Sequence, residues 1–160
     1  MDTVSPIYRP NVAAIIRRPG NKILVGERSD RPGSWQFPQG GIKTRETPEE
    51  ALERELFEEV GLSGGSYRIL ERKEPYRYLF DKGRTKEGYH GQEQIYFLVE
   101  LLPGFEPQHV TSEPEFRALR WIDPAEFNIK WVPPFKRDVY RQVLNLFFGV
   151  QSLVGDGNQP

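Results

Sequence analysis

Apolar residues recur along the chain in short runs, and runs of this length flanked by turn residues are typical of buried β-strands. Strands are predicted at residues 11–16, 22–25, 67–70, 94–101 and 116–122. The first two are separated by Pro19, Gly20 and Asn21, so they are predicted to form a hairpin. Residues 29–41 and 81–91 contain several glycines and no such run, which predicts loops.

Capping residues predict where the first helix begins and ends. Thr47 fits the N-cap position, Pro48 fits the first helical position, and Glu50 completes a capping box with Thr47. Gly61 is a natural C-terminal cap, so the helix is predicted to end at Val60.

A second helix is predicted near the C-terminus by an apolar stripe with helical spacing, which we interpret as a core-facing side. The stripe consists of Phe135, Val139, Val143, Leu144 and Phe147, and the other positions hold Lys136, Arg137, Asp138, Arg141 and Asn145. Strands mixed with two main helices predict a single α/β domain spanning residues 1–160. Residues 155–160 are predicted to form a frayed tail.

Composition excludes several classes of protein. The 22 lysines and arginines are balanced by 23 acidic residues, so no extended nucleic-acid surface is expected, and a short end or a nucleotide is the better candidate partner. The absence of cysteine excludes disulfides and thiolate metal sites, and it agrees with a cytoplasmic location. We expect no membrane association, because residues 1–6 are unlike a signal peptide and no stretch of 18 apolar residues occurs.

Three carboxylates are crowded on one side of the first predicted helix. At about 100° per residue, Glu55, Glu58 and Glu59 lie within a wedge of about 100°. A Glu-rich side is often only solvated, and Arg54 could pair with Glu58 one turn later. However, three clustered carboxylates repel one another unless a hard divalent cation binds them. Facing a glycine-rich loop, such a cluster indicates phosphate chemistry.

The same residues carry a resemblance to a known family. The pattern G-x₅-E-x₇-R-E-U-x-E-E-x-G-U, where U is aliphatic, is matched at every fixed position by Gly40, Glu46, Arg54, Glu55, Leu56, Glu58, Glu59, Gly61 and Leu62. This pattern resembles the motif of the Nudix hydrolases. The resemblance implies an α/β/α sandwich with a mixed β-sheet and hydrolysis of a phosphoanhydride bond. The implied cofactor is Mg²⁺, for which Mn²⁺ can substitute.

The resemblance also implies roles for individual residues. By position, Glu55, Glu58 and Glu59 are expected to be metal ligands and catalytic residues. Glu115 is expected to be a further ligand or the general base, and a backbone carbonyl at Gln39 or Gly40 to complete the metal shell. Two further box residues have supporting roles, Arg54 in orienting the box glutamates and Glu46 in bracing the loop.

Segments outside the motif resemble bacterial RNA pyrophosphohydrolases and the related dinucleoside polyphosphate hydrolases. They are residues 8–11, 34–42, 91–92, 114–116 and 135–140. By this resemblance the substrate-binding residues are Arg9, Arg28, Ser34, Tyr78, Phe135 and Lys136, although each could instead be a surface cation or a packing side chain. Arg45 stands where the family commonly has glycine. His90 and His109 lack metal-ligand spacing.

Several functions remain open at this point. The flanking segments favour removal of pyrophosphate from the 5′-triphosphate end of RNA, which leaves a 5′-monophosphate. The alternatives are a dinucleoside polyphosphate hydrolase that releases ATP from diadenosine tetraphosphate and a pyrophosphatase acting on free nucleoside triphosphates. A fourth possibility, a binding module that has lost catalysis, is disfavoured because a binder does not need crowded carboxylates.

Overall fold

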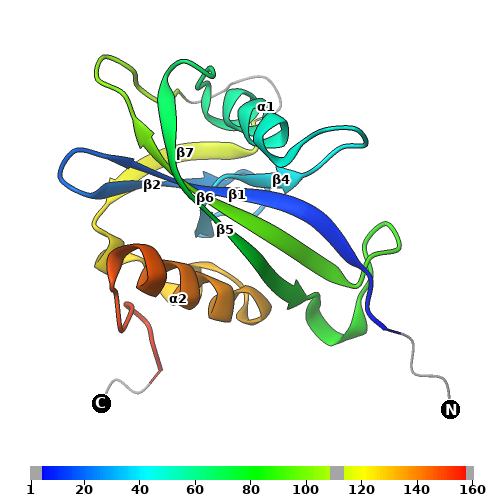
Figure 1. The fold of residues 1–160 in the computed structure, drawn as a ribbon. Helices are drawn as coiled ribbons and strands as arrows, with labels where there is room; N and C mark the ends of the chain where they lie inside the picture. The colour runs from blue at the N-terminus through cyan, green and yellow to red at the C-terminus, as the bar shows by residue number, and fades with distance from the viewer. Residues whose placement is uncertain (1–4, 109–113, 158–160) are drawn as a thin grey trace, which may run out of the picture.

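The fold consists of a mixed sheet covered by one helix on each face (Figure 1). The computed structural model describes residues 5–108 and 114–157. The strands are β1 (Tyr8–Arg18), β2 (Lys22–Arg28), β3 (Trp35–Gln36), β4 (Gln39–Gly41), β5 (Tyr67–Leu79), β6 (Gly91–Leu101) and β7 (Phe116–Ile122). The α-helices are α1 (Pro48–Val60) and α2 (Pro134–Phe148), and short 3₁₀ helices are η1 (Asp81–Gly83), η2 (Pro124–Glu126) and η3 (Ile129–Trp131).

The sheet is mixed because its two central strands run parallel. The order is β3-β2-β1-β6-β5, with β4 added to β1 and β7 added to β2. β1 and β6 pair in parallel from Tyr8 opposite Gly91 to Arg17 opposite Glu100, and the other pairs are antiparallel. The predicted α/β class with a mixed sheet between helices is therefore confirmed.

Alternating residues of the central strand divide the core into two halves. Val12, Ala14 and Ile16 belong to the cluster packed against α1, whereas Ala13 and Ile15 belong to the cluster packed against α2. Both faces of β1 are buried, which explains its continuous apolar run.

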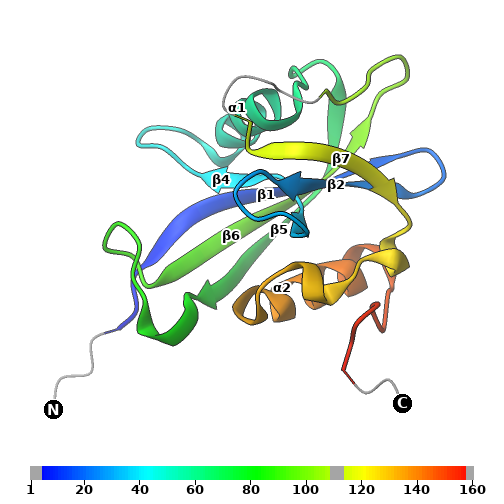
Figure 2. The same ribbon diagram turned by 180° about the vertical axis from the view of Figure 1, so that it is seen from behind.

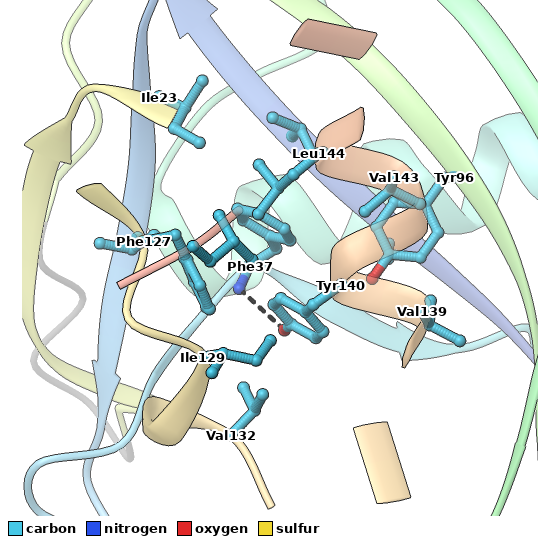
Figure 3. Close-up of a cluster of buried hydrophobic side chains, with 14 of the residues drawn as sticks. Ile23, Phe37, Tyr96, Phe127, Ile129, Val132, Val139, Tyr140, Val143 and Leu144 are labelled. Atoms are coloured by element: carbon cyan, nitrogen blue, oxygen red, sulfur yellow. Dashed lines mark hydrogen bonds between the residues drawn. The ribbon is translucent and has the colours of Figure 1, made fainter. Parts of the chain in front are cut away.

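The α2 side of the core is built around stacked aromatic rings (Figure 3). The rings of Phe37 and Tyr140 are 4.9 Å apart and nearly parallel, and the Tyr140 hydroxyl accepts a hydrogen bond from the Phe37 backbone N–H. Each fully buried side chain of this size contributes about 1.5–3 kcal/mol to folding. Phe37 lies between β3 and β4, two residues before Gln39, so this packing anchors the segment that leads into β4.

The predicted first helix is confirmed at both ends. The Thr47 side chain accepts from the backbone of Glu50, the Glu50 side chain accepts from the backbone of Thr47, and Gly61 has a left-handed φ of 68°. Its buried side includes Leu52, Leu56 and Val60, as the apolar pattern indicates.

Other predicted boundaries were wrong. β5 continues nine residues beyond Leu70 to Leu79, because as an edge strand its charged side chains stay in solvent while its backbone pairs with β6. Likewise, residues 29–41 are not all loop, since β3 and β4 pair with β2 and β1. On α2, Lys136 was placed with the polar residues but is buried.

Two further predictions concern the C-terminal tail and membrane-spanning segments. Asp156, in the predicted tail, accepts hydrogen bonds from Leu153 N and Arg141 Nε, both at 2.9 Å. Residues 158–160 lie outside the described residues. Within the ranges 5–108 and 114–157, no helix is long and apolar enough to cross a membrane.

Candidate active site

α1, which carries Glu55, Glu58 and Glu59, lies above β4, where the glycine-rich loop ends (Figure 2). Glu55, Glu58 and Glu59 line a pocket of about 360 Å³. Its other lining residues include Arg9, Asn11, Gln39, Gly40, Gly41 and Glu115. The structure thus brings the four carboxylates predicted from the sequence to one pocket.

Arg54 organises the acidic side of this pocket. Its guanidinium donates to both carboxylate oxygens of Glu46 at 2.7 and 2.9 Å, to Glu55 at 2.6 Å and to the Gly41 carbonyl at 2.8 Å. A longer contact of 3.4 Å reaches Glu58. In turn, Glu46 accepts from the Lys43 backbone N–H. The pairing predicted for Arg54 with box glutamates is present, and Glu46 joins Arg54 to the loop residue Lys43.

The Arg54–Glu46 pair predicts a loss of stability in acid. The hydrogen bond from Arg54 is the main cause that lowers the pKa of Glu46 from 4.5 to about 2. A depressed carboxyl pKa stabilises the folded state above the unfolded value of 4.5, and this contribution is lost as the pH falls toward 2. Urea unfolding of the wild type and Glu46→Gln should show a stability difference at pH 6 that shrinks steadily below pH 4.5. A difference that does not change with pH would contradict this assignment.

Glu59 is the most buried of the box glutamates and has an unused oxygen. The side chain lies in the core-facing wall of α1, and Oε2 has no hydrogen-bond partner among the described residues. Burial raises the pKa of Glu59, and a hydrogen bond with the neighbouring Glu55 carboxyl and its charge raise it further. An ionised carboxylate here lacks a cation, because Arg54 is already bonded to Glu46 and Glu55.

These residues fit a hard divalent cation. In the described part of the chain no three acidic or histidine side chains are already arranged as a metal cluster. Arg54 holds Glu55 and Glu58 in ion pairs. Nevertheless, a buried oxygen without a partner on Glu59, beside further carboxylates in one pocket, is a donor set that Mg²⁺-like ions prefer.

Gly40 is required by the close approach of α1 to β4. A Cβ atom at Gly40 would lie within the position of the Glu55 carboxylate, and one at Gly41 would meet the Arg9 guanidinium. Only glycine therefore lets both side chains lie directly on the strand. This contact explains in physical terms why the glycines are needed near the carboxylate helix.

A second pocket, of about 390 Å³, is cationic and aromatic. Its lining includes four residues predicted from the sequence: Arg28, Tyr78, Phe135 and Lys136. The rings of Tyr78 and Phe135 are 5.6 Å apart, and the Lys136 ammonium is 5.9 Å from the centre of the Tyr78 ring. Burial, followed by the charges of nearby cations, lowers the pKa of Lys136 to about 8. A bound anion would relieve this repulsion.

The two pockets are parts of one cleft. Four residues, Gln39, Lys86, Gln92 and Glu115, line both of them. One end of the cleft is therefore acidic and the other is cationic and aromatic, with Glu115 at the junction. This arrangement suits a molecule that has a polyphosphate at one end and a base at the other.

Several residues of the cationic end were not predicted from the sequence. Arg31, Gln36, Arg84 and Lys86 line it, but nothing local marks them, and only the polarity of residues 81–91 could have indicated the last two. Conversely, Ser34 lines neither part of the cleft, and its hydroxyl donates to the Trp131 carbonyl at 2.6 Å.

The histidines and Arg45 have other surroundings. His90 Nδ1 accepts a hydrogen bond from the Ile7 backbone N–H, and His109 lies outside the described residues. Arg45 is exposed and has a φ of 68°. Glycine adopts this left-handed conformation without strain, which explains why the family commonly has glycine there.

Comparison with known proteins decides the family. A model of the NUDIX domain matches residues 7–143. The chain belongs to the Nudix family. Like other Nudix hydrolases, it is a hydrolase with a site for divalent metal ions. An RNA pyrophosphohydrolase of Helicobacter pylori (strain P12) is 44% identical over 148 residues, which cover 88% of this chain and 93% of that protein.

Two solved structures share the fold of this Nudix hydrolase. The E. coli dihydroneopterin triphosphate pyrophosphohydrolase has a TM-score of 0.67 at 21% identity, covering 88% of this chain and 97% of that one. A C. elegans Ap4A hydrolase has a TM-score of 0.64 at 22% identity, covering 88% and 98%. At such low identity these likenesses show the common architecture alone.

Proposed function

We propose that this Nudix hydrolase removes pyrophosphate from the 5′-triphosphate end of RNA and leaves a 5′-monophosphate, with Mg²⁺ as its metal ion. The main support is the single cleft in which an acidic end adjoins a cationic, aromatic end. Further support comes from the 44% identity to an RNA pyrophosphohydrolase over most of both chains.

The residues of the cleft have separate roles in the proposed reaction. Arg9, Arg28 and Lys136 bind phosphate oxygens, and Tyr78 and Phe135 contact the first bases. Glu55, Glu58, Glu59 and the Gly40 carbonyl would hold Mg²⁺, or Mn²⁺ as a substitute, and the bound ion would supply neutralisation of the phosphate oxygens and polarisation of the attacked phosphorus. Ser34 lies outside the lining of the cleft and bonds to the Trp131 carbonyl, so it is given no direct contact with the substrate.

Glu115 is suited to proton transfer. It lies at the junction of the two parts of the cleft and is exposed, so its carboxylate can meet water and the phosphate chain together. Either as general base or as a further metal ligand, Glu115 assists when a water oxygen forms a bond to phosphorus and the phosphoanhydride bond breaks. In the first role the proton of water passes to Glu115 and pyrophosphate leaves.

A comparison of substrates tests this function. With Mg²⁺, the wild type should cleave triphosphorylated RNA with a kcat/KM at least about 10-fold higher than that for diadenosine tetraphosphate or free ATP. The reason is that neither alternative substrate fills the cationic end with an RNA chain. Product analysis should detect pyrophosphate and 5′-monophosphate RNA. Efficient release of ATP from diadenosine tetraphosphate with indifference to RNA would overturn the proposal, and so would a preference for free nucleoside triphosphates.

A further inference from the structure

A smaller pocket adjoins the cationic end of the cleft. We call this space, of about 270 Å³, the side pocket. It shares Arg31 and Pro133 with the cleft, so the two are contiguous. Its other lining residues include Lys130, Trp131 and Arg137. A ligand that fills the cationic end can therefore continue past Arg31 and Pro133 into this space.

The side pocket carries positive charge without internal compensation. Arg31, Lys130 and Arg137 line it, and no carboxylate does. Among residues 5–108 and 114–157, none of these three forms an ion pair, whereas Arg28 is paired with Asp30 and Arg141 with Asp138. Three unpaired cations around one space favour an anionic occupant.

The walls of this space are held in place before any ligand arrives. The Arg137 Nε–H donates to the Val132 carbonyl at 3.0 Å, and the Lys130 backbone N–H donates to Asn128. The Ser34 hydroxyl joins the opposite wall to Trp131. The Ser34–Trp131 bond joins segments 97 residues apart, and the Val132 carbonyl holds the Arg137 guanidinium, so part of this wall is ordered before a ligand binds, which lowers the entropy cost of binding.

We propose that the side pocket binds the phosphodiester backbone of RNA, downstream of the nucleotides held in the cleft. This inference rests on the proposed function. With the triphosphate at the acidic end and the first bases at the cationic end, the 3′ continuation of the chain leaves past Arg31 and Pro133. Phosphates there meet Lys130 and Arg137. A free nucleoside triphosphate has no phosphodiester to place in the pocket.

Substrates of increasing length test the proposal. Triphosphorylated RNAs of one, two, three and four nucleotides should show a KM that falls once the chain reaches the side pocket. Lys130→Gln should raise the KM for the tetranucleotide about 3- to 10-fold. It should also reduce the slope of the logarithm of the binding constant against the logarithm of salt concentration by about one. The kcat for the tetranucleotide and the KM for the mononucleotide should stay unchanged. Arg137→Gln should act in the same direction.

The control removes one charge elsewhere. Lys73 is exposed on β5 and lines none of the pockets described above, so Lys73→Gln should leave the KM unchanged for every length. If Lys130→Gln changes the KM equally for the mononucleotide and the tetranucleotide, or changes neither, the proposal for the side pocket is overturned and the proposed function stands. A wild type that ignores triphosphorylated RNA of every length would overturn the proposed function, and the inference with it.

Discussion

Glu58→Gln should lower kcat at least about 100-fold while leaving the fold intact. The substitution removes one negative charge from the acidic end of the cleft, and the loss corresponds to about 2.7 kcal/mol of transition-state stabilisation. Stability should hardly change, because the Glu58 side chain is 53% exposed and its contact with Arg54 is 3.4 Å long. Steady-state kinetics with triphosphorylated RNA and urea unfolding measure the two effects separately.

The matched control for Glu58→Gln is on the same helix. Glu53 is exposed on α1 but lines none of the pockets described here, so Glu53→Gln removes the same charge without touching the cleft. It should keep nearly full turnover. If Glu58→Gln also keeps wild-type turnover, the assignment of Glu58 as a metal ligand is wrong.

Arg54→Ala should destabilise the protein by about 3 kcal/mol. The guanidinium is largely shielded from solvent, with 19% of its side chain exposed, and it holds Glu46 and Glu55 together with the Gly41 carbonyl. Its removal leaves two poorly hydrated carboxylates without a cation, which costs more than the pair itself contributes. Arg54→Lys should recover only part of the loss, because one ammonium cannot reproduce the planar set of donors.

Arg141→Ala is the comparison for Arg54→Ala. Arg141 also contacts two carboxylates, those of Asp138 and Asp156, but 42% of its side chain is exposed. We therefore expect a loss below about 1 kcal/mol. Urea unfolding at neutral pH measures both variants. If the two substitutions lower the free energy of unfolding equally, shielding from solvent does not determine how much Arg54 stabilises the fold.

Local signals explain how much of the fold could be predicted. The capping residues of α1 act within four positions, so Thr47, Glu50 and Gly61 predict both ends of the helix correctly. β1 is also readable, because burial on both faces leaves an apolar run. By contrast, the edge strand β5 carries charged side chains, and only its pairing with β6 reveals it.

Long-range contacts explain why the site was predicted only in part. The carboxylates of α1 share one side by helix geometry alone. Lys136 is buried 5.9 Å from the ring of Tyr78, which comes from a different part of the chain. The Ser34 hydroxyl donates a hydrogen bond to the carbonyl of Trp131, 97 residues away. No local pattern records such contacts, so Arg31 and Lys86 were missed and Ser34 was placed in the cleft.

The parallel pairing of β1 with β6 has a consequence for biosynthesis. Residues 19–90 separate the two strands, and at about 5–20 residues per second a ribosome needs roughly 4 to 14 s to make that segment. Throughout this interval β1 lacks its central neighbour. The apolar side of α1 then has only part of its sheet to cover it. We therefore expect the nascent chain to expose aggregation-prone surface until β6 emerges, and a chaperone that binds apolar segments should favour chains stalled before Gly91.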